Sequence, residues 1–342
     1  MFLLHLHNTG VKHGRKSFAG WSATRLATRW RNPAREHILR RRVQDTPRAP
    51  SVHRRGASRP GAGTDRGAVR HLLLFPPMPT VSIVLPTYNR LPLLREAVDS
   101  VRAQTFDDWE LIVLDDGSDD GTMEYLQALS GEDPRIVPVP LPHIGRLPGL
   151  RNEGIRRARG EWVAFLDSDD VWRADKLQAH MDAHRAHPQA RWSYSGRSVM
   201  DADGQTIPEG RFVPPFQPHS GWIAHLLLTH EAQLAAPTLV MERALLREVG
   251  GQDESLAFCA DYELGLRMSV RSECICLPEP LVRVRVHAAS TTHRRVEVSE
   301  AFIQVYRKFA DAHGSAEVRR LCDQQEAFYA AKIARRRAET GA

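Results

Sequence analysis

The stretch Val81-Ser82-Ile83-Val84-Leu85-Pro86-Thr87-Tyr88-Asn89-Arg90 decides the fold class. Its first five residues form a short apolar run typical of a buried strand, and apolar residues at helical spacing follow Pro92. Further apolar runs occur at 109–114, 135–139 and 162–166, with helical patterns between them. Such alternation predicts an α/β fold in which helices cover both faces of a mostly parallel sheet. Pro138 indicates that the third run lies at a sheet edge.

Polar residues collect where three of these strands end. The first strand ends in Pro86-Thr87-Tyr88, the second in Asp115-Asp116-Gly117 and the fourth in Asp167-Ser168-Asp169-Asp170. Ligands of open parallel sheets bind beyond the carboxyl ends of the strands, so we expect these residues to share one site. Clustered carboxylates repel one another unless a cation lies among them, and oxygen ligands beside a phosphate suit Mg²⁺ or Mn²⁺.

Each of these motifs also has a purely structural interpretation. The Asp115-Asp116-Gly117 segment could be a turn whose carboxylates bind nearby backbone N–H groups. Asp169 or Asp170 could cap a helix that begins near Val171, and Tyr88 could be half-buried packing. The joint placement of the motifs at three strand ends favours a binding site.

The charge of the chain is unevenly distributed. The 342 residues contain 47 Lys and Arg against 41 Asp and Glu, a net charge of +6. Residues 1–77 hold 16 of these basic residues and 3 of the acidic ones, which leaves 31 basic and 38 acidic residues, a net charge of −7, for 78–342. The overall positive charge therefore does not indicate that the folded part binds nucleic acid.

The composition of residues 1–77 predicts disorder, because Arg, Gly, Pro and Ser dominate and few apolar residues are available to pack. Three interpretations remain: a basic arm that binds nucleic acid or anionic lipid, an organelle transit peptide, or a segment outside the natural protein, whose translation would begin at Met78. We favour the last. Residues 78–295 then form the main domain, and 296–342 a helical extension with two apolar stripes.

Two other classes of protein are disfavoured. No stretch approaches the roughly 18 apolar residues of a membrane-spanning helix. The four cysteines, Cys259, Cys274, Cys276 and Cys322, are too few for a disulfide scaffold and lack zinc-site spacing. We therefore expect reduced, mostly buried thiols in a cytoplasmic protein.

The chain resembles the family 2 glycosyltransferases, an inverting group with a GT-A fold, over about residues 80–294. The resemblance rests on the opening strand at 81–90, the second strand and turn at 110–122, the Leu150-Arg151-Asn152 helix and the Asp-x-Asp motif at 165–170. It implies a Rossmann-like α/β/α sandwich that binds a nucleotide sugar, most commonly a UDP-sugar, together with Mg²⁺ or Mn²⁺.

The resemblance also implies roles for the donor-side residues. Tyr88 would stack on the base and Asp116 would accept a hydrogen bond from the base edge, while Pro86 and Thr87 would line the pocket mainly through backbone. Arg151 would contact the diphosphate or the sugar, with a solvated helix residue as the alternative. Asp167 would contact the ribose or share the metal, and Asp169 would bind the metal. His287 lies in a segment at 285–290 that resembles the family's Arg-x-His-x-x-Ser pattern, and it would bind the metal or the diphosphate.

On the acceptor side, the resemblance implies that Asp261 is the general base that takes the acceptor proton, with helix capping as the alternative or additional role. Three positions depart from the family pattern: Ala260 replaces an acid, Gln252 a Phe and Gly265 a Trp.

The main hypothesis is a metal-assisted inverting glycosyltransferase of bacterial surface polysaccharide or glycolipid synthesis. Its acceptor would be a saccharide or a lipid-linked sugar, and the C-terminal helices would suit peripheral contact with the inner face of the membrane. The alternatives are a catalytically degenerate nucleotide-sugar-binding protein, motivated by Ala260, and nucleic-acid binding through the basic arm. We expect no nucleic-acid partner.

Overall fold

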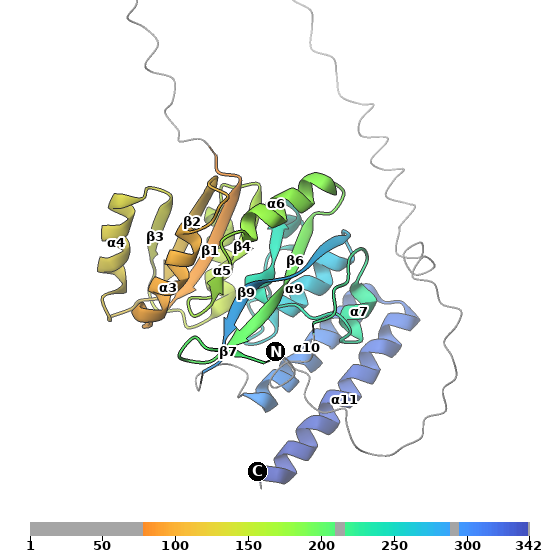
Figure 1. Cartoon of the computed structure of the whole chain (residues 1–342). Helices are drawn as coiled ribbons and strands as arrows, with labels where there is room; N and C mark the ends of the chain where they lie inside the picture. Colours follow the sequence, from red (N-terminus) through yellow and green to blue (C-terminus); the bar gives the residue numbers. More distant parts are fainter. Residues whose placement is uncertain (1–77, 209–215, 288–293, 341–342) are drawn as a thin grey trace, which may run out of the picture. The chain divides into compact units, whose positions relative to one another are not determined.

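The computed structural model describes residues 78–208, 216–287 and 294–340 (Figure 1). The expected leader at 1–77 and the end of the His287 segment, 288–290, lie outside these ranges. The interpretations given to them therefore stay predictions.

The first half of the fold is a parallel sheet. Its strands are β1 (Val81–Thr87), β2 (Trp109–Asp115), β3 (Ile136–Pro140) and β4 (Trp162–Phe165), arranged in the order β3-β2-β1-β4. All neighbours in this group pair in parallel. β3 lies at the edge, as Pro138 predicts, and the carboxyl ends of all four strands meet at one edge of the sheet.

The second half extends the same sheet in the order β8-β6-β9-β5. These strands are β8 (Val240–Glu242), β6 (Trp192–Met200), β9 (Cys274–Arg285) and β5 (Val171–Trp172), and β7 (Thr206–Ile207) pairs with β6. β8 and β5 run antiparallel to their neighbours, while β6 and β9 pair in parallel. The expected mostly parallel sheet is confirmed. The helix expected near Val171 is wrong, because that residue begins a strand.

Helices cover both faces of the sheet (Figure 1). On one face, α3 (Leu91–Arg102), α4 (Thr122–Glu132) and α6 (Lys176–Ala186) contribute to a core that also contains alternate residues of β1 and β2. α5 (Leu147–Arg157) packs on the opposite face. There a Cβ on its Gly154 would lie 2.3 Å from Val84 Cγ1, so only glycine allows this close approach.

The remaining helices belong to the second half of the chain. They are α7 (Ala224–Leu228), the 3₁₀ helix η1 (Ala236–Thr238), α8 (Arg243–Val249), α9 (Ala260–Ser269), α10 (Arg295–His313) and α11 (Ala316–Thr340). The two C-terminal helices confirm the expected pair and lie side by side (Figure 1). The Tyr306 and Tyr329 hydroxyls lie 2.7 and 2.9 Å from His230 Nε2, which ties this pair to the loop after α7.

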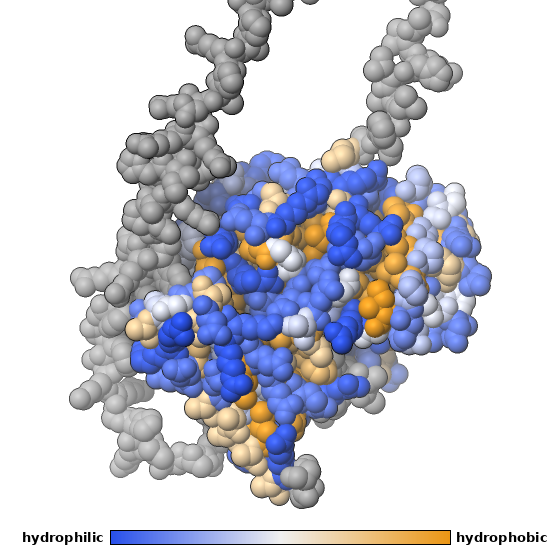
Figure 2. Space-filling model, turned by 180° about the vertical axis from the view of Figure 1, so that it is seen from behind, coloured by the Kyte–Doolittle hydropathy of each residue, from blue (hydrophilic) through white to orange (hydrophobic). Residues whose placement is uncertain are grey.

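The surface in Figure 2 is mainly hydrophilic, with hydrophobic residues in separate areas. In the described ranges, the large hydrophobic side chains that are exposed are Met78, Tyr88, Ile144, Leu147 and Phe328. None of the helices described here is apolar over a length that would cross a bilayer.

A buried polar network fixes α6 against the sheet. Lys176 is fully buried, and its Nζ lies 3.5 Å from His180 Nε2 and 4.4 Å from the Trp172 ring centroid. His180 Nδ1 and His184 Nε2 in turn lie 2.7 and 2.8 Å from Ser193 Oγ on β6. Burial lowers the pKa of Lys176 to about 7, and no carboxylate in the described part of the chain pairs with it.

The low pKa of Lys176 predicts that the protein becomes more stable as the pH rises. Unfolding returns the pKa from about 7 to 10.5, so between these values the unfolded chain binds more protons than the folded one. Lys176→Met should raise the free energy of unfolding at pH 7 by a few kcal/mol and flatten the pH dependence in this window. Thermal unfolding of the wild type and the variant between pH 7 and 10.5 measures this pH dependence. Arg185→Met, on the exposed side of the same helix, is the control, and an unchanged slope in Lys176→Met would contradict the expectation.

Candidate functional site

Three carboxylates crowd the turn that follows β4, and each is compensated by a different arginine. Asp167 is paired with Arg151 of α5. Asp169 Oδ2 accepts hydrogen bonds from Arg90, just beyond β1, and from His287, just beyond β9, both at 3.0 Å. Two chain segments that are far from Asp169 in the sequence therefore converge on its carboxylate.

The third acid, Asp170, is buried and holds the end of β9 in place. Its Oδ1 accepts the backbone N–H of Arg285 at 2.9 Å. The buried Arg285 side chain donates in return to the carbonyls of Asp169 and Ala202 and to Glu96 of α3. Asp170 and Arg285 therefore link the Asp-x-Asp turn to the end of β9. Asp170 does not cap a helix.

The crowding alters the acidity of two of these groups. Burial, together with the charges of Asp169 and Asp167, raises the pKa of Asp170 well above its usual range. Burial also raises the pKa of Asp167; the Arg151 charge opposes this shift, while the charges of Asp169 and Asp261 add to it. A divalent cation at this turn would relieve the repulsion.

The donor-side residues expected from the sequence come together at the ends of β1 and β2. Pro86 and Thr87 are the last two residues of β1 and are buried, and the Thr87 hydroxyl has no hydrogen-bond partner among the described residues. Tyr88 is 42% exposed and its ring lies against that of His143, so the half-buried packing interpretation and the binding interpretation both stay open. The Asp116 carboxylate is buried and accepts the backbone N–H groups of Ile144 and Gly145, so part of the turn interpretation is correct as well.

Arg151 is a buried residue, so its interpretation as a solvated helix residue is wrong. Its guanidinium bonds Asp167 and lies 5.3 Å from the Phe165 ring centroid, and its Nε has no partner in the described ranges. This arrangement fixes Asp167 and leaves the buried Nε donor unpaired.

Asp261 lies in the first turn of α9 and does not occupy the N-cap position, which is Cys259 in a left-handed conformation (φ 61°). Asp261 Oδ2 accepts the Ala236 N–H at 3.1 Å. Because its charge contributes to the raised pKa of Asp167, Asp261 faces the same site as the Asp-x-Asp turn.

Neighbouring groups account for two of the departures on the acceptor side. Leu234 fills the space beside Gly265, where a Cβ would lie 2.2 Å from the leucine Cδ1. The Gln252 backbone exchanges two hydrogen bonds with the Asn152 side chain, at 2.8 and 2.9 Å. Ala260, in place of the usual acid, is buried, so the acids of the first turn of α9 are Asp261 and Glu263, and Glu263 is paired with Arg267.

The donor set suits a hard divalent cation that also binds phosphate. In residues 78–208, 216–287 and 294–340, no group of three His, Cys, Asp or Glu side chains is arranged to hold a metal ion. Mg²⁺ in nucleotide sites is held by one or two carboxylates, with phosphates and water completing the shell. Asp169 and His287, whose side chains are in contact with each other, fit such a site in which the protein supplies only some of the metal ligands.

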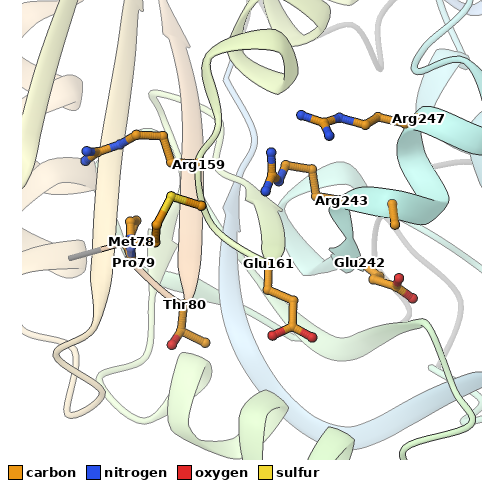
Figure 3. A pocket seen from close by; sticks show the side chains of 9 residues that line it. Met78, Pro79, Thr80, Arg159, Glu161, Glu242, Arg243 and Arg247 are labelled. Atoms are coloured by element: carbon orange, nitrogen blue, oxygen red, sulfur yellow. The ribbon is translucent and has the colours of Figure 1, made fainter. Parts of the chain in front are cut away.

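A separate pocket of about 480 Å³ lies at the opposite edge of the sheet (Figure 3). Thr80 and Glu161, at the amino ends of β1 and β4, line it together with Arg159, Arg243 and Arg247. Because it faces the amino ends of the parallel strands, this pocket is distinct from the candidate site. Three of the four free cysteines are buried, as expected, and the fourth, Cys259, is the N-cap of α9.

Three residues of the site were not predicted from the sequence: Arg90, His143 and Arg285. Arg90 and Arg285 belong to the motifs at 81–90 and 285–290, so their membership in these motifs could have predicted that they lie at the site. His143 belongs to a connection without a recognisable pattern. It contacts both Tyr88 and Asp116.

Comparisons with known proteins identify the family. The model of "Glycosyl transferase family 2" matches residues 82–221. An uncharacterised glycosyltransferase of Nostoc sp. is 40% identical over 240 residues, which cover 67% of this chain and 74% of that protein. The chain belongs to glycosyltransferase family 2. The enzyme class and the family expected from the sequence are thereby confirmed.

Two further relatives carry more specific names. The putative teichuronic acid biosynthesis glycosyltransferase TuaG of Bacillus subtilis is 40% identical over 38% of this chain and 51% of its own length. An Escherichia coli β-1,3-glucosyltransferase, named for UDP-Glc and a GlcNAc-diphosphoundecaprenol acceptor, is 31% identical over 48% of this chain and 61% of its own length. The chain thus spans only about half to three fifths of these two proteins.

Solved structures confirm the GT-A fold. S. aureus TarS 1–349 in complex with UDP-GlcNAc has a TM-score of 0.57 and 19% identity, covering 73% of this chain and 71% of that one. The mannosyltransferase PcManGT of Pyrobaculum calidifontis, in complex with GDP-Man and Mn²⁺, has a TM-score of 0.52 and 20% identity, covering 77% and 76%. At these identities the likeness concerns the fold.

The contacts of Arg285 predict a large structural effect for its removal. Arg285→Met leaves the Asp169 and Ala202 carbonyls without their donor and should lower the free energy of unfolding by about 2–4 kcal/mol. Glu96→Gln should cost less than about 1 kcal/mol, because Glu96 is 53% exposed. Urea denaturation of both variants measures the difference, and equal losses would contradict the assigned role.

Proposed function

We propose that the protein moves a sugar from a nucleotide-diphosphate donor to an acceptor hydroxyl, with inversion and with the help of a divalent cation. The observation that carries the proposal is the convergence of Arg90 and His287 on Asp169. A carboxylate that attracts two cationic or metal-ligating side chains at the carboxyl edge of a parallel sheet is suited to a metal–diphosphate complex.

The donor nucleotide would lie along the ends of β1, β2 and β4. Tyr88 offers a ring face to the base, Asp116 offers a carboxylate to the base edge, and Pro86 and Thr87 form the floor. Asp167, fixed by Arg151, would contact the ribose or share the cation. The unpaired Thr87 hydroxyl and Arg151 Nε support this placement, because buried polar groups in native proteins normally have a partner.

Asp169 and His287 would hold the Mg²⁺ or Mn²⁺ ion. When bound, the cation offsets the negative charge that develops on the leaving diphosphate. Arg90 already contacts Asp169 and would add a second positive charge at the same place. The Mn²⁺ in the PcManGT complex supports the choice of metal.

Asp261 is the proposed general base. It would take the proton from the acceptor hydroxyl as that oxygen attacks the anomeric carbon. The Ala236 N–H fixes the carboxylate through one oxygen. A single direct displacement, with one base and no covalent intermediate, inverts the anomeric configuration.

We propose a saccharide or lipid-linked acceptor in the synthesis of a bacterial surface polysaccharide or glycolipid. The names of the Bacillus subtilis and Escherichia coli relatives, which refer to teichuronic acid and to a diphosphoundecaprenol-linked sugar, support this class. An acceptor of that kind would place the enzyme at the inner face of the membrane, in peripheral contact.

The first test removes the base. Asp261→Asn should lower the rate of sugar transfer about 10²- to 10⁴-fold and leave nucleotide binding unchanged, because the base acts on the acceptor. Product formation with a panel of nucleotide sugars and of free and lipid-linked saccharides is measured by mass spectrometry, and donor binding by thermal shift. Asp311→Asn, at a carboxylate whose side chain is 81% exposed, is the control.

Two outcomes of this test would overturn the assignment. Full transfer by Asp261→Asn would exclude Asp261 as the base. Donor binding by the wild type without product from any acceptor would favour the alternative that Ala260 suggests, a degenerate nucleotide-sugar-binding protein.

The second test removes the metal ligand. Asp169→Ala should weaken the binding of nucleoside diphosphate about 100-fold in the presence of Mn²⁺ and have little effect in a chelator, because the ligand acts through the cation. Calorimetry with and without Mn²⁺ measures both affinities. Asp175→Ala, in an exposed ion pair at the start of α6, is the control. Equal affinities for wild type and Asp169→Ala in Mn²⁺ would refute the metal role.

A further inference from the structure

A buried carboxylate lies beneath two exposed rings at the donor end of the site. The Asp116 side chain is 3% exposed, whereas that of His143 is 52% exposed and Tyr88 is 42% exposed. The Tyr88 and His143 ring centroids are 4.2 Å apart, with an angle of 31° between the planes. A planar heterocycle can stack on these rings while its N–H groups reach the carboxylate.

Two exposed apolar residues lie at this place. Tyr88 is in ring contact with His143, and Ile144, which is 46% exposed, donates its backbone N–H to Asp116. Two of the five large hydrophobic side chains exposed in the described residues thus belong to residues next to one buried acid. Exposed apolar groups that rim a polar centre mark a ligand site.

The hydrogen bonds already made by Asp116 limit what it can accept. Its Oδ1 accepts the Ile144 N–H at 2.6 Å, and its Oδ2 accepts the Gly145 N–H at 2.9 Å. His143 Nδ1 lies 3.0 Å from Oδ2 and 2.9 Å from the Asp116 carbonyl oxygen. Both of these atoms are acceptors, so Nδ1 carries the proton, which it donates to the carbonyl while it faces Oδ2. Oδ2 thus accepts one N–H and has the His143 ring nitrogen against its other side, whereas Oδ1 accepts one N–H and keeps a lone pair that His143 does not face.

We infer that His143 restricts the donor to a base with a single imide N–H, namely uracil or thymine. Guanine presents N1–H and N2–H side by side and needs both carboxylate oxygens, of which His143 and Gly145 occupy one. Cytosine offers no N–H at its N3 position. The inference rests on the proposed function, because it assumes that the donor nucleotide binds here.

The connection that carries His143 is held rigidly. Leu141 N–H donates to the Asp115 carbonyl, and Asp116 N–H donates to that of Thr87, both at 2.9 Å. Gly117 has φ +80°, and a Cβ there would lie 3.2 Å from His143 N, so only glycine permits this approach. The pattern of free and filled lone pairs is therefore set before a ligand arrives.

Two substitutions separate the ring of His143 from its hydrogen bond. His143→Phe keeps a stacking ring and loses the Nδ1 donor, whereas His143→Asn keeps a donor and loses the ring. Calorimetry with UDP, GDP and CDP in Mn²⁺ should show that the wild type binds UDP at least about 10-fold more tightly than GDP or CDP. In His143→Phe the UDP-to-GDP ratio should fall about fivefold or more. In His143→Asn both affinities should weaken while the ratio stays.

The outcomes distinguish this inference from the proposed function. Equal or tighter binding of GDP by the wild type, or an unchanged ratio in His143→Phe, would overturn the role of His143 and leave the proposed function intact. A wild-type protein that binds none of the three nucleotides would instead overturn the proposed function itself. Thermal unfolding of each variant shows that it is folded.

Discussion

The repulsion among Asp167, Asp169 and Asp170 is the constraint on which the rest of the site depends. Three acids within four residues cannot all remain ionised at the edge of a folded core unless each has a partner. The chain supplies these partners from Arg151, from Arg90 with His287, and from the backbone of Arg285. The ends of β1, β4 and β9 and the start of α5 are therefore held in one arrangement by charge.

Most of the fold could be predicted from the sequence, because apolar runs and helical spacing report directly on burial. The runs at 81–85, 109–114 and 162–166 became β1, β2 and β4 within one or two residues. Val171 was the exception. Its segment pairs with β9, more than 100 residues later, and no local pattern could reveal that partner.

The site was predictable where function coincides with a strand end. Tyr88, Asp116, Asp167 and Asp169 all follow strands, and topology alone brings them together. The burial of Arg151 and the contacts of His143 depend on side chains packed from other elements, so the sequence could not specify them. On the acceptor side, Leu234 beside Gly265 shows that a departure from the family pattern is offset by a residue 31 positions earlier.

The wide spacing of the partners also limits how such chains can recombine. Arg90 and His287 lie 79 and 118 residues from Asp169, and Arg285 lies 115 residues from Asp170. A chimera that joins the first half of this chain to the second half of a relative would separate the acids from the side chains that neutralise them. Exchange of segments within the family should therefore succeed only where the ends of β1, β4 and β9 are inherited together.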